Sequence, residues 1–226
     1  MIFLRTYGKF RLFFPIFLYV IGFGAVSCYA DSYYDRKVSL FELLPIGNDD
    51  IVFVGNSITD GGEMNELLGM SNIKNRGISS DVIDGVSKRI SQVMSGKPKK
   101  VFLLIGINDI SHNLNVSQLS AKYEKLVKKM RELSPYTEIY LQSVMPVNND
   151  FKRYKSLLGK EKTIVAFNKE ISRIAAENGC IYIDLTKTLS DTNTGKLKRA
   201  FTNDGLHLTG LGYKAWMEAI KPYVIK

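Results

Sequence analysis

Residues 50–59 read Asp-Ile-Val-Phe-Val-Gly-Asn-Ser-Ile-Thr, and this stretch is central to the fold class. Four apolar residues, 51–54, follow an acidic residue and end at a glycine. This pattern predicts a short strand buried on both faces, as in the middle of a parallel sheet. Ser57 comes just past the strand, near a possible helix start, where backbone N–H groups can receive developing negative charge. Taken alone, Ser57 is better interpreted as a helix cap, so other segments must decide its role.

Further apolar runs predict strands along the rest of the chain, and amphipathic segments separate them. The predicted strands cover 72–77, 100–106, 138–144 and 180–184, and the predicted helices cover 63–68, 82–94, 117–133, 162–177 and a final segment from Thr209. Strands that alternate with helices favour a parallel sheet with helices on both faces. Residues 148–159 show no clear pattern and are long for a connection, which favours a loop over a site.

Composition excludes several protein classes. The chain has 226 residues, of which 45% are hydrophobic and 23% are charged, as expected for one α/β domain and against a disordered or collagen-like chain. The net charge is +9, but the basic residues are spread along the chain, so we interpret them as solubilising, with some preference for acidic substrates or surfaces. No nucleic-acid-binding motif occurs, and no nucleic-acid partner is expected.

The first thirty residues have the layout of a secretory signal peptide. Three basic residues precede an apolar run over 12–26, and the first acidic residue is Asp31. We predict a signal peptide at 1–30, cleaved after Ala30, and a secreted or periplasmic domain at 31–226. An alternative is a bacterial lipoprotein signal over 25–28, with Cys28 lipidated and the protein attached to a membrane. An uncleaved N-terminal anchor is a third reading, although the run is short for a membrane span.

Metal and disulfide chemistry have little support. The cysteines are Cys28 and Cys180, and the histidines are His112 and His207. Two histidines are too few for a three-histidine zinc site, and Cys180 alone cannot build a disulfide framework or a thiolate site. We therefore predict no metal site.

An acid and a histidine are paired in the segment Asp204-Gly205-Leu206-His207. An acid three residues before a histidine lets both side chains point the same way, so the carboxylate can orient the imidazole. Taken alone, His207 is better interpreted as a capping or surface histidine. Asp184, at a predicted strand end, is a rival acid, but it lacks this spacing.

Four blocks of the chain together resemble the SGNH (GDSL) hydrolase family. The blocks are Gly55-Asn56-Ser57, Gly77, Gly106-Ile107-Asn108-Asp109 and Asp204-x-x-His207, and they occur in the order and at the spacing of that family. The family often has Asp at the position of Asn56, which is not catalytic there. The resemblance implies an α/β, three-layer α/β/α flavodoxin-like fold with a mostly parallel five-stranded sheet. Residues 56–59 and 75–79 are most similar to secreted bacterial members and platelet-activating-factor acetylhydrolase-like esterases.

Residue by residue, the resemblance implies a serine hydrolase mechanism. Ser57 would be the nucleophile, His207 the general base and acid, and Asp204 the carboxylate that steadies the imidazole. The oxyanion hole would consist of the backbone N–H groups of Ser57 and Gly77 and the side-chain amide of Asn108. This chemistry requires no metal or organic cofactor.

The resemblance and the export signal together predict a secreted serine esterase. Its expected substrates are short acyl esters, in particular O-acetyl groups on carbohydrate such as acetylated sugars or sialic acid, so the expected partner is a small-molecule or glycan ester. A lysophospholipase or thioesterase acting on longer acyl chains is the rival among enzymes. A non-catalytic carbohydrate-binding relative is the alternative from another class, but the intact Ser57, Asp204, His207 and Asn108 argue against it.

Overall fold

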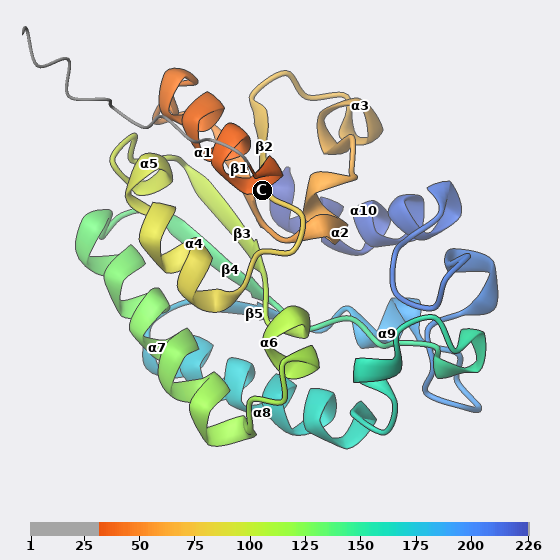
Figure 1. Cartoon of the computed structure of the whole chain (residues 1–226). Helices are drawn as coiled ribbons and strands as arrows, with labels where there is room; N and C mark the ends of the chain where they lie inside the picture. The colour runs from red at the N-terminus through yellow and green to blue at the C-terminus, as the bar shows by residue number, and fades with distance from the viewer. Residues whose placement is uncertain (1–31, 226) are drawn as a thin grey trace, which may run out of the picture.

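Five short parallel strands form the centre of the computed structural model, which describes residues 32–225 (Figure 1). The signal peptide predicted at 1–30 therefore lies outside the described residues. The strands are β1 (Ile51–Gly55), β2 (Ile73–Gly77), β3 (Lys100–Leu104), β4 (Glu138–Gln142) and β5 (Ile181–Ile183). Every neighbouring pair is parallel, which confirms the predicted parallel five-stranded sheet.

The strand order is β2-β1-β3-β4-β5, as in flavodoxin-like folds. The chain runs outward from β1 to β2 and then returns past β1 to β3, so the connections after β1 and β3 leave the sheet in opposite directions. Such a reversal opens a crevice beyond the carboxyl ends of the two strands, where ligands bind in open α/β sheets. Ser57 follows β1 and Asn108 follows β3, so both residues lie at this crevice.

The helices cover both faces of the sheet (Figure 1). On one face α4, α7 and α8 lie side by side, and on the other α10 crosses the sheet. No helix within residues 32–225 is long and apolar enough to cross a membrane. The helices are α1 (Tyr33–Leu43), α2 (Ser57–Asp60), α3 (Met64–Leu68), α4 (Ile83–Arg89), α5 (Ser91–Met94), α6 (Ile107–Ser111), α7 (Val116–Leu133), α8 (Glu161–Glu177), α9 (Thr186–Leu189) and α10 (Gly210–Val224), with short 3₁₀ turns at η1 (Asn149–Phe151), η2 (Lys155–Leu157) and η3 (Arg199–Phe201).

A row of aromatic rings joins the sheet to α10. The strand register places Phe53 opposite Phe102, and Phe102 opposite Tyr140. Their rings therefore stack across three strands, with centroids 4.9 and 4.5 Å apart. Trp216 of α10 packs edge-on against Phe53 at 6.3 Å and is fully buried, so it belongs to the core.

Two predicted elements differ in detail. The helix predicted at 82–94 is divided into α4 and α5, with Ile90 between them. Helix α7 begins at Val116, because Asn115 and Gln118 form a reciprocal capping box at its start.

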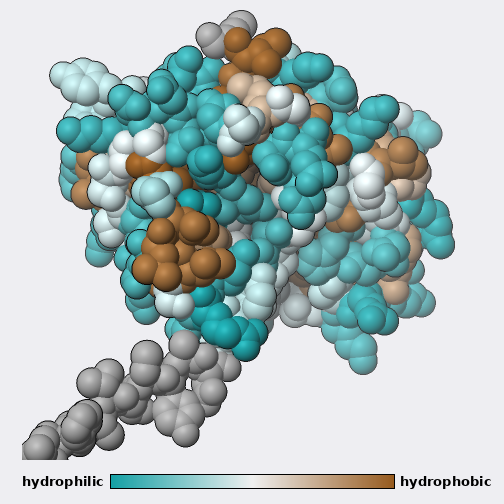
Figure 2. Space-filling view, turned by 90° about the horizontal axis from the view of Figure 1, so that it is seen from above, coloured by the Kyte–Doolittle hydropathy of each residue, from teal (hydrophilic) through white to brown (hydrophobic). Residues whose placement is uncertain are grey.

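From above, the surface is mainly hydrophilic, with separate apolar patches (Figure 2).

A buried ion pair ties the end of β1 to the turn that follows β2. Arg89 of α4 places Nη2 2.8 Å from Asp81 Oδ2, and the same nitrogen donates to the carbonyl oxygen of Gly55 at 3.2 Å. Arg89 is only 3% exposed and Asp81 only 2%. Because both charges are removed from water, each depends on the other for compensation.

We expect Asp81→Asn to destabilise the protein by about 3–5 kcal/mol, because it leaves the Arg89 guanidinium buried without a counter-charge. Urea unfolding at pH 7 measures this free energy. Glu124→Gln is the matched control, since it removes a solvent-accessible carboxylate that pairs with Lys128 on α7 and Arg173 on α8, and it should leave the midpoint almost unchanged. A loss below about 1 kcal/mol in Asp81→Asn would contradict a structural role for the buried pair.

Candidate active site

Three side chains from opposite ends of the chain meet beyond the carboxyl ends of the strands. Ser57 Oγ lies 2.9 Å from His207 Nε2, and His207 Nδ1 lies 2.8 Å from Asp204 Oδ2. Ser57 begins α2 directly after β1, whereas Asp204 and His207 lie in the loop before α10. The structure thus brings together the hydroxyl, imidazole and carboxylate that the sequence pattern singled out.

The turn after β1 presents Ser57 by a local mechanism. Asn56 caps α2, because its Oδ1 accepts the N–H of Ile58 at 3.1 Å. Ser57 is therefore not the cap, and its hydroxyl is available to His207. Gly55 allows the end of β1 to lie close to the end of β3, since a Cβ at Gly55 would lie 2.5 Å from the carbonyl oxygen of Leu104.

Asp204 is held by donors on both carboxylate oxygens. Oδ1 accepts the backbone N–H groups of Leu206 and His207 at 2.9 and 2.8 Å. Burial alone would raise the pKa of Asp204, but the hydrogen bonds from His207 and these backbone groups lower it to about 2. The carboxylate therefore stays ionised at neutral pH. It can accept a hydrogen bond from the N–H at Nδ1 of His207. The other ring nitrogen, Nε2, is then unprotonated and can accept a hydrogen bond from the Ser57 hydroxyl.

Tyr154 is a member of this group that sequence reasoning missed. Its hydroxyl lies 2.9 Å from Asp204 Oδ2 and 3.0 Å from His207 Nδ1. Its ring meets the imidazole edge-on, with centroids 5.7 Å apart. The predicted loop at 148–159 carries Tyr154 to the site, so the prediction of a loop over a site is confirmed, although no local signal marked the tyrosine.

Asn108 lies at the start of α6, beyond β3. One hydrogen of its Nδ2 group goes to the carbonyl oxygen of Asp81, 2.8 Å away, which leaves the second for another acceptor. The next residue, Asp109, accepts the N–H of Ile83 at the start of α4. Burial raises the pKa of Asp109 to about 6.

Gly77 does not have the role that was predicted for it. Its N–H donates to Asn75 Oδ1 at 2.8 Å, so it is not free to bind an oxyanion. A Cβ at Gly77 would lie 2.2 Å from the backbone nitrogen of Asp60. Glycine is needed here because β2 packs closely against α2, and the prediction of Gly77 as an oxyanion donor is corrected.

A free backbone donor occurs three residues later, at Ser80. The N–H of Asp81 donates to the carbonyl oxygen of Ile78 at 3.1 Å, closing a turn in which Ser80 has a φ of 67°. A positive φ at a residue other than glycine is uncommon. Within residues 32–225, the N–H groups of Ser57 and Ser80 have no acceptor. Ser80 directly precedes Asp81, whose carbonyl oxygen accepts the side-chain amide of Asn108, so Ser80 and Asn108 lie close together.

The rival acid, Asp184, has a separate structural role. Its Oδ1 accepts both the N–H and the hydroxyl of Thr186, at 3.1 and 2.5 Å, at the start of α9. The choice of Asp204 over Asp184 as the partner of His207 therefore agrees with the geometry.

A small apolar hollow of about 10 Å³ lies next to the turn that carries Ser57, since Asn56 and Ile58 both line it. Its lining includes a chain neighbour of each of Ser57, Asn108 and His207, namely Ile58, Ile107 and Leu206. The ends of β3 and β4 contribute further lining residues, among them Leu104, Val144 and Met145. Space of this size admits about one water-sized group.

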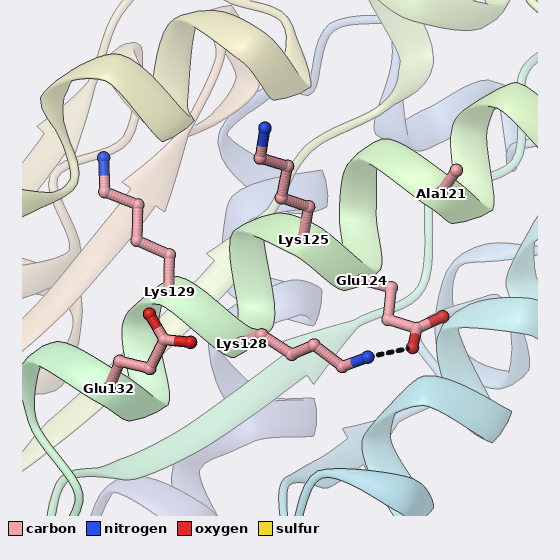
Figure 3. A pocket seen from close by; sticks show the side chains of 6 residues that line it. All are labelled: Ala121, Glu124, Lys125, Lys128, Lys129 and Glu132. Atoms are coloured by element: carbon pink, nitrogen blue, oxygen red, sulfur yellow. Dashed lines mark ion pairs between the residues drawn. The ribbon is translucent and has the colours of Figure 1, made fainter.

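A larger hollow of about 620 Å³ lies on the outer face of α7 and has no part in this site (Figure 3). It is lined by Ala121 and by lysines and glutamates of α7. Lys128 pairs with Glu124 at 2.7 Å, one helical turn away. This pattern is typical of a solvated helix face.

Comparison with known proteins supports the same family. Residues 53–215 match the GDSL-like Lipase/Acylhydrolase family. No curated protein shows a significant match. A structure from Streptococcus pneumonia described as a platelet activating factor has a TM-score of 0.77 at 26% identity, over 85% of this chain and 92% of that chain.

Two more distant structures share the fold. A GDSL-like lipase from Bacteroides thetaiotaomicron has a TM-score of 0.74 at 22% identity, covering 85% of this chain and 97% of its own. An acetylxylan esterase from Geobacillus stearothermophilus has a TM-score of 0.64 at 19% identity, covering 80% and 96%. The family match over most of the chain, together with the fold, confirms the resemblance to SGNH hydrolases, and this protein belongs to the GDSL-like lipase/acylhydrolase family.

Proposed function

We propose that this acylhydrolase is a serine esterase that removes short acyl groups, in particular O-acetyl groups from carbohydrate. The observation that carries the proposal is the continuous line from Ser57 Oγ through His207 to Asp204, with contacts of 2.9 and 2.8 Å. These distances suit proton transfer from the hydroxyl to the imidazole. An ionised Asp204 can stabilise the imidazolium that this transfer creates.

Ester cleavage then proceeds in two halves. Ser57 Oγ attacks the ester carbonyl carbon while its proton passes to His207 Nε2, and the carbonyl electrons move onto oxygen. When this intermediate collapses, the alcohol leaves with the proton from Nε2 and an acyl-serine remains. Water attacks the acyl-serine in the same way, with His207 as the base, and the carboxylic acid and free Ser57 are released.

Three donors are suited to the negative charge on the carbonyl oxygen. They are the backbone N–H groups of Ser57 and Ser80 and the second hydrogen of Asn108 Nδ2. All are uncharged and held by the turns that carry them, so they need little reorganisation as charge develops. In this proposal Ser80 takes the place predicted for Gly77.

The hollow next to the turn that carries Ser57 supports a preference for an acetyl group. It has space for about one water-sized group, and its lining side chains of Leu104, Met145 and Leu206 are all buried. A longer acyl chain would need these packed side chains to move, which costs free energy in a dense core. The preference for carbohydrate esters has weaker support, namely the shared fold with an acetylxylan esterase.

Export is also part of the proposal, and it is supported by the N-terminal sequence alone. A mature domain from Asp31 would act outside the cell or in the periplasm. The alternative is a domain attached to the membrane through a lipid on Cys28.

Hydrolysis of p-nitrophenyl acetate by the mature protein tests the mechanism. We expect Ser57→Ala to reduce turnover to background, because no nucleophile remains. Asn108→Ala should lower kcat by about 10²–10³, the usual effect of losing one oxyanion donor. Ser80→Gly is the control, because it keeps the backbone N–H at this positive φ and should retain activity. Unchanged turnover in Ser57→Ala would end the serine mechanism.

A series of p-nitrophenyl esters from acetate to palmitate tests the acyl preference. We expect the acetate ester to be the best substrate, and Met145→Ala to shift the optimum toward propionate or butyrate by opening the hollow. A single methylene is typically worth 10–200-fold in such a pocket. Met130→Ala, a buried change in α7 away from the hollow, should leave the preference unchanged. An optimum beyond about eight carbons would favour a lysophospholipase or thioesterase instead.

The predicted export and cleavage can be tested by expressing the full chain in a bacterial host and measuring the intact mass of the exported protein. We expect a chain that begins at Asp31, as the cleavage pattern predicts. A diacylated N-terminal Cys28 would support the lipoprotein alternative, and a full-length mass would support the uncleaved anchor.

A further inference from the structure

Tyr154 forms a closed triangle of polar atoms with the acid and the histidine. Its hydroxyl lies 2.9 Å from Asp204 Oδ2 and 3.0 Å from His207 Nδ1, and those two atoms are 2.8 Å apart. The mechanism described above uses only one side of this triangle. The tyrosine therefore has a role that ester cleavage by Ser57, His207 and Asp204 does not explain.

The hydroxyl of Tyr154, the carboxylate of Asp204 and the Nδ1–H of His207 can all be hydrogen-bonded in one arrangement of their protons. An ionised carboxylate can only accept, so the single Tyr154 hydroxyl proton goes to Asp204 Oδ2. The Nδ1 proton of His207 also points at Oδ2 and is shared with the phenol oxygen. Burial and the hydrogen bond to Asp204 raise the pKa of Tyr154 to about 12, so the hydroxyl remains a donor at every pH at which the enzyme would work.

The loop that carries Tyr154 is attached to the segment that carries the other two residues. The backbone N–H of Asn148 donates to the carbonyl oxygen of Gly205 at 2.8 Å, and its side chain donates to Leu197 at 2.9 Å. Gly205 has a φ of 90°, and a Cβ there would lie 2.3 Å from the carbonyl oxygen of Asn148. The two segments therefore pack backbone to backbone, between the chain positions of Asp204 and His207.

The carboxylate is thereby fixed on both of its oxygens. Backbone N–H groups of Leu206 and His207 hold Oδ1, and the Tyr154 hydroxyl shares Oδ2 with the imidazole. Without the hydroxyl, Oδ2 would have one donor fewer and the imidazole would lose its second contact at Nδ1. Both losses affect how His207 Nε2 is aimed at Ser57.

We propose that Tyr154 is a positioning residue for ester hydrolysis, whose hydroxyl aligns the Asp204 carboxylate and the His207 ring so that Nε2 faces Ser57 Oγ. The inference rests on the proposed serine esterase mechanism. Tyr154 acts through Asp204 and His207 and is not assigned a contact with substrate. The competing role is a purely structural one, in which the ring only packs the loop against the domain.

Tyr154→Phe separates the two roles, because it removes the hydroxyl and keeps the ring. We expect kcat on p-nitrophenyl acetate to fall about 10-fold or more, as for a lost hydrogen bond to a charged group, with KM within twofold of wild type. The acidic limb of the kcat/KM profile should move to higher pH by about half a unit, since a carboxylate with fewer donors favours the protonated imidazole. A structural role would not move this limb.

Tyr140→Phe is the matched control. Tyr140 also donates its hydroxyl to a carboxylate, Glu138 Oε2 at 2.6 Å, but it does so in β4 with its ring stacked on Phe102. Removing the Tyr140 hydroxyl should leave kcat and the pH profile unchanged. Wild-type kcat and an unshifted profile in Tyr154→Phe would overturn the proposal, and a loss seen only in Tyr154→Ala would assign the ring a packing role instead.

A double-mutant cycle supplies a second readout. If Tyr154 acts through the acid, Tyr154→Phe should cost far less in the Asp204→Asn background than in the wild type. Equal costs in both backgrounds would overturn the inference even if the single variant is less stable. The labelling rate of Ser57 by diisopropyl fluorophosphate should fall in parallel with kcat. Wild-type protein that neither hydrolyses esters nor reacts with this reagent would instead refute the proposed function itself.

Discussion

The contact between Ser57 Oγ and His207 Nε2 joins two residues that are 150 positions apart, and the proposed chemistry depends on it. The sheet topology makes this contact possible. The reversal between β1 and β3 opens a crevice at the carboxyl edge, and the chain returns to that edge through the loop before α10. Trp216 holds α10 against Phe53 of β1, so the loop with His207 and the turn with Ser57 are carried by elements that share one core contact.

Close backbone approach is the second constraint. Gly55, Gly77 and Gly205 each lie where a Cβ would meet the backbone of another segment at 2.2–2.5 Å. The three approaches join β1 to β3, β2 to α2, and the Tyr154 loop to the loop of Asp204 and His207. These glycines serve packing. The donors that we propose for the oxyanion belong instead to Ser57, Ser80 and Asn108, which lie in turns next to these packed segments.

Sequence reasoning identified the strands because each is a short apolar run between polar turns, and a strand buried on both faces has few alternatives. It identified Ser57, Asp204 and His207 because their order and spacing resemble those of a known family. It assigned Gly77 wrongly, because the family resemblance pointed to this glycine, whereas its N–H is occupied by Asn75. Ser80 had no local signal, since its positive φ is imposed by the turn between Ile78 and Asp81.

The amino-acid sequence by itself determined the fold class and the family, and it singled out Ser57, His207 and Asp204 as the candidate nucleophile, histidine and acid. Those features follow from the local pattern of apolar residues and from the order of residues along the chain, and both can be read without knowing how the chain folds. Only the tertiary structure decided which N–H groups remain free, how large a hollow lies next to the turn of Ser57, and that Tyr154 reaches Asp204 and His207. Those features depend on contacts between distant segments, and the free energy of such contacts has no counterpart in the spacing of residues along the chain.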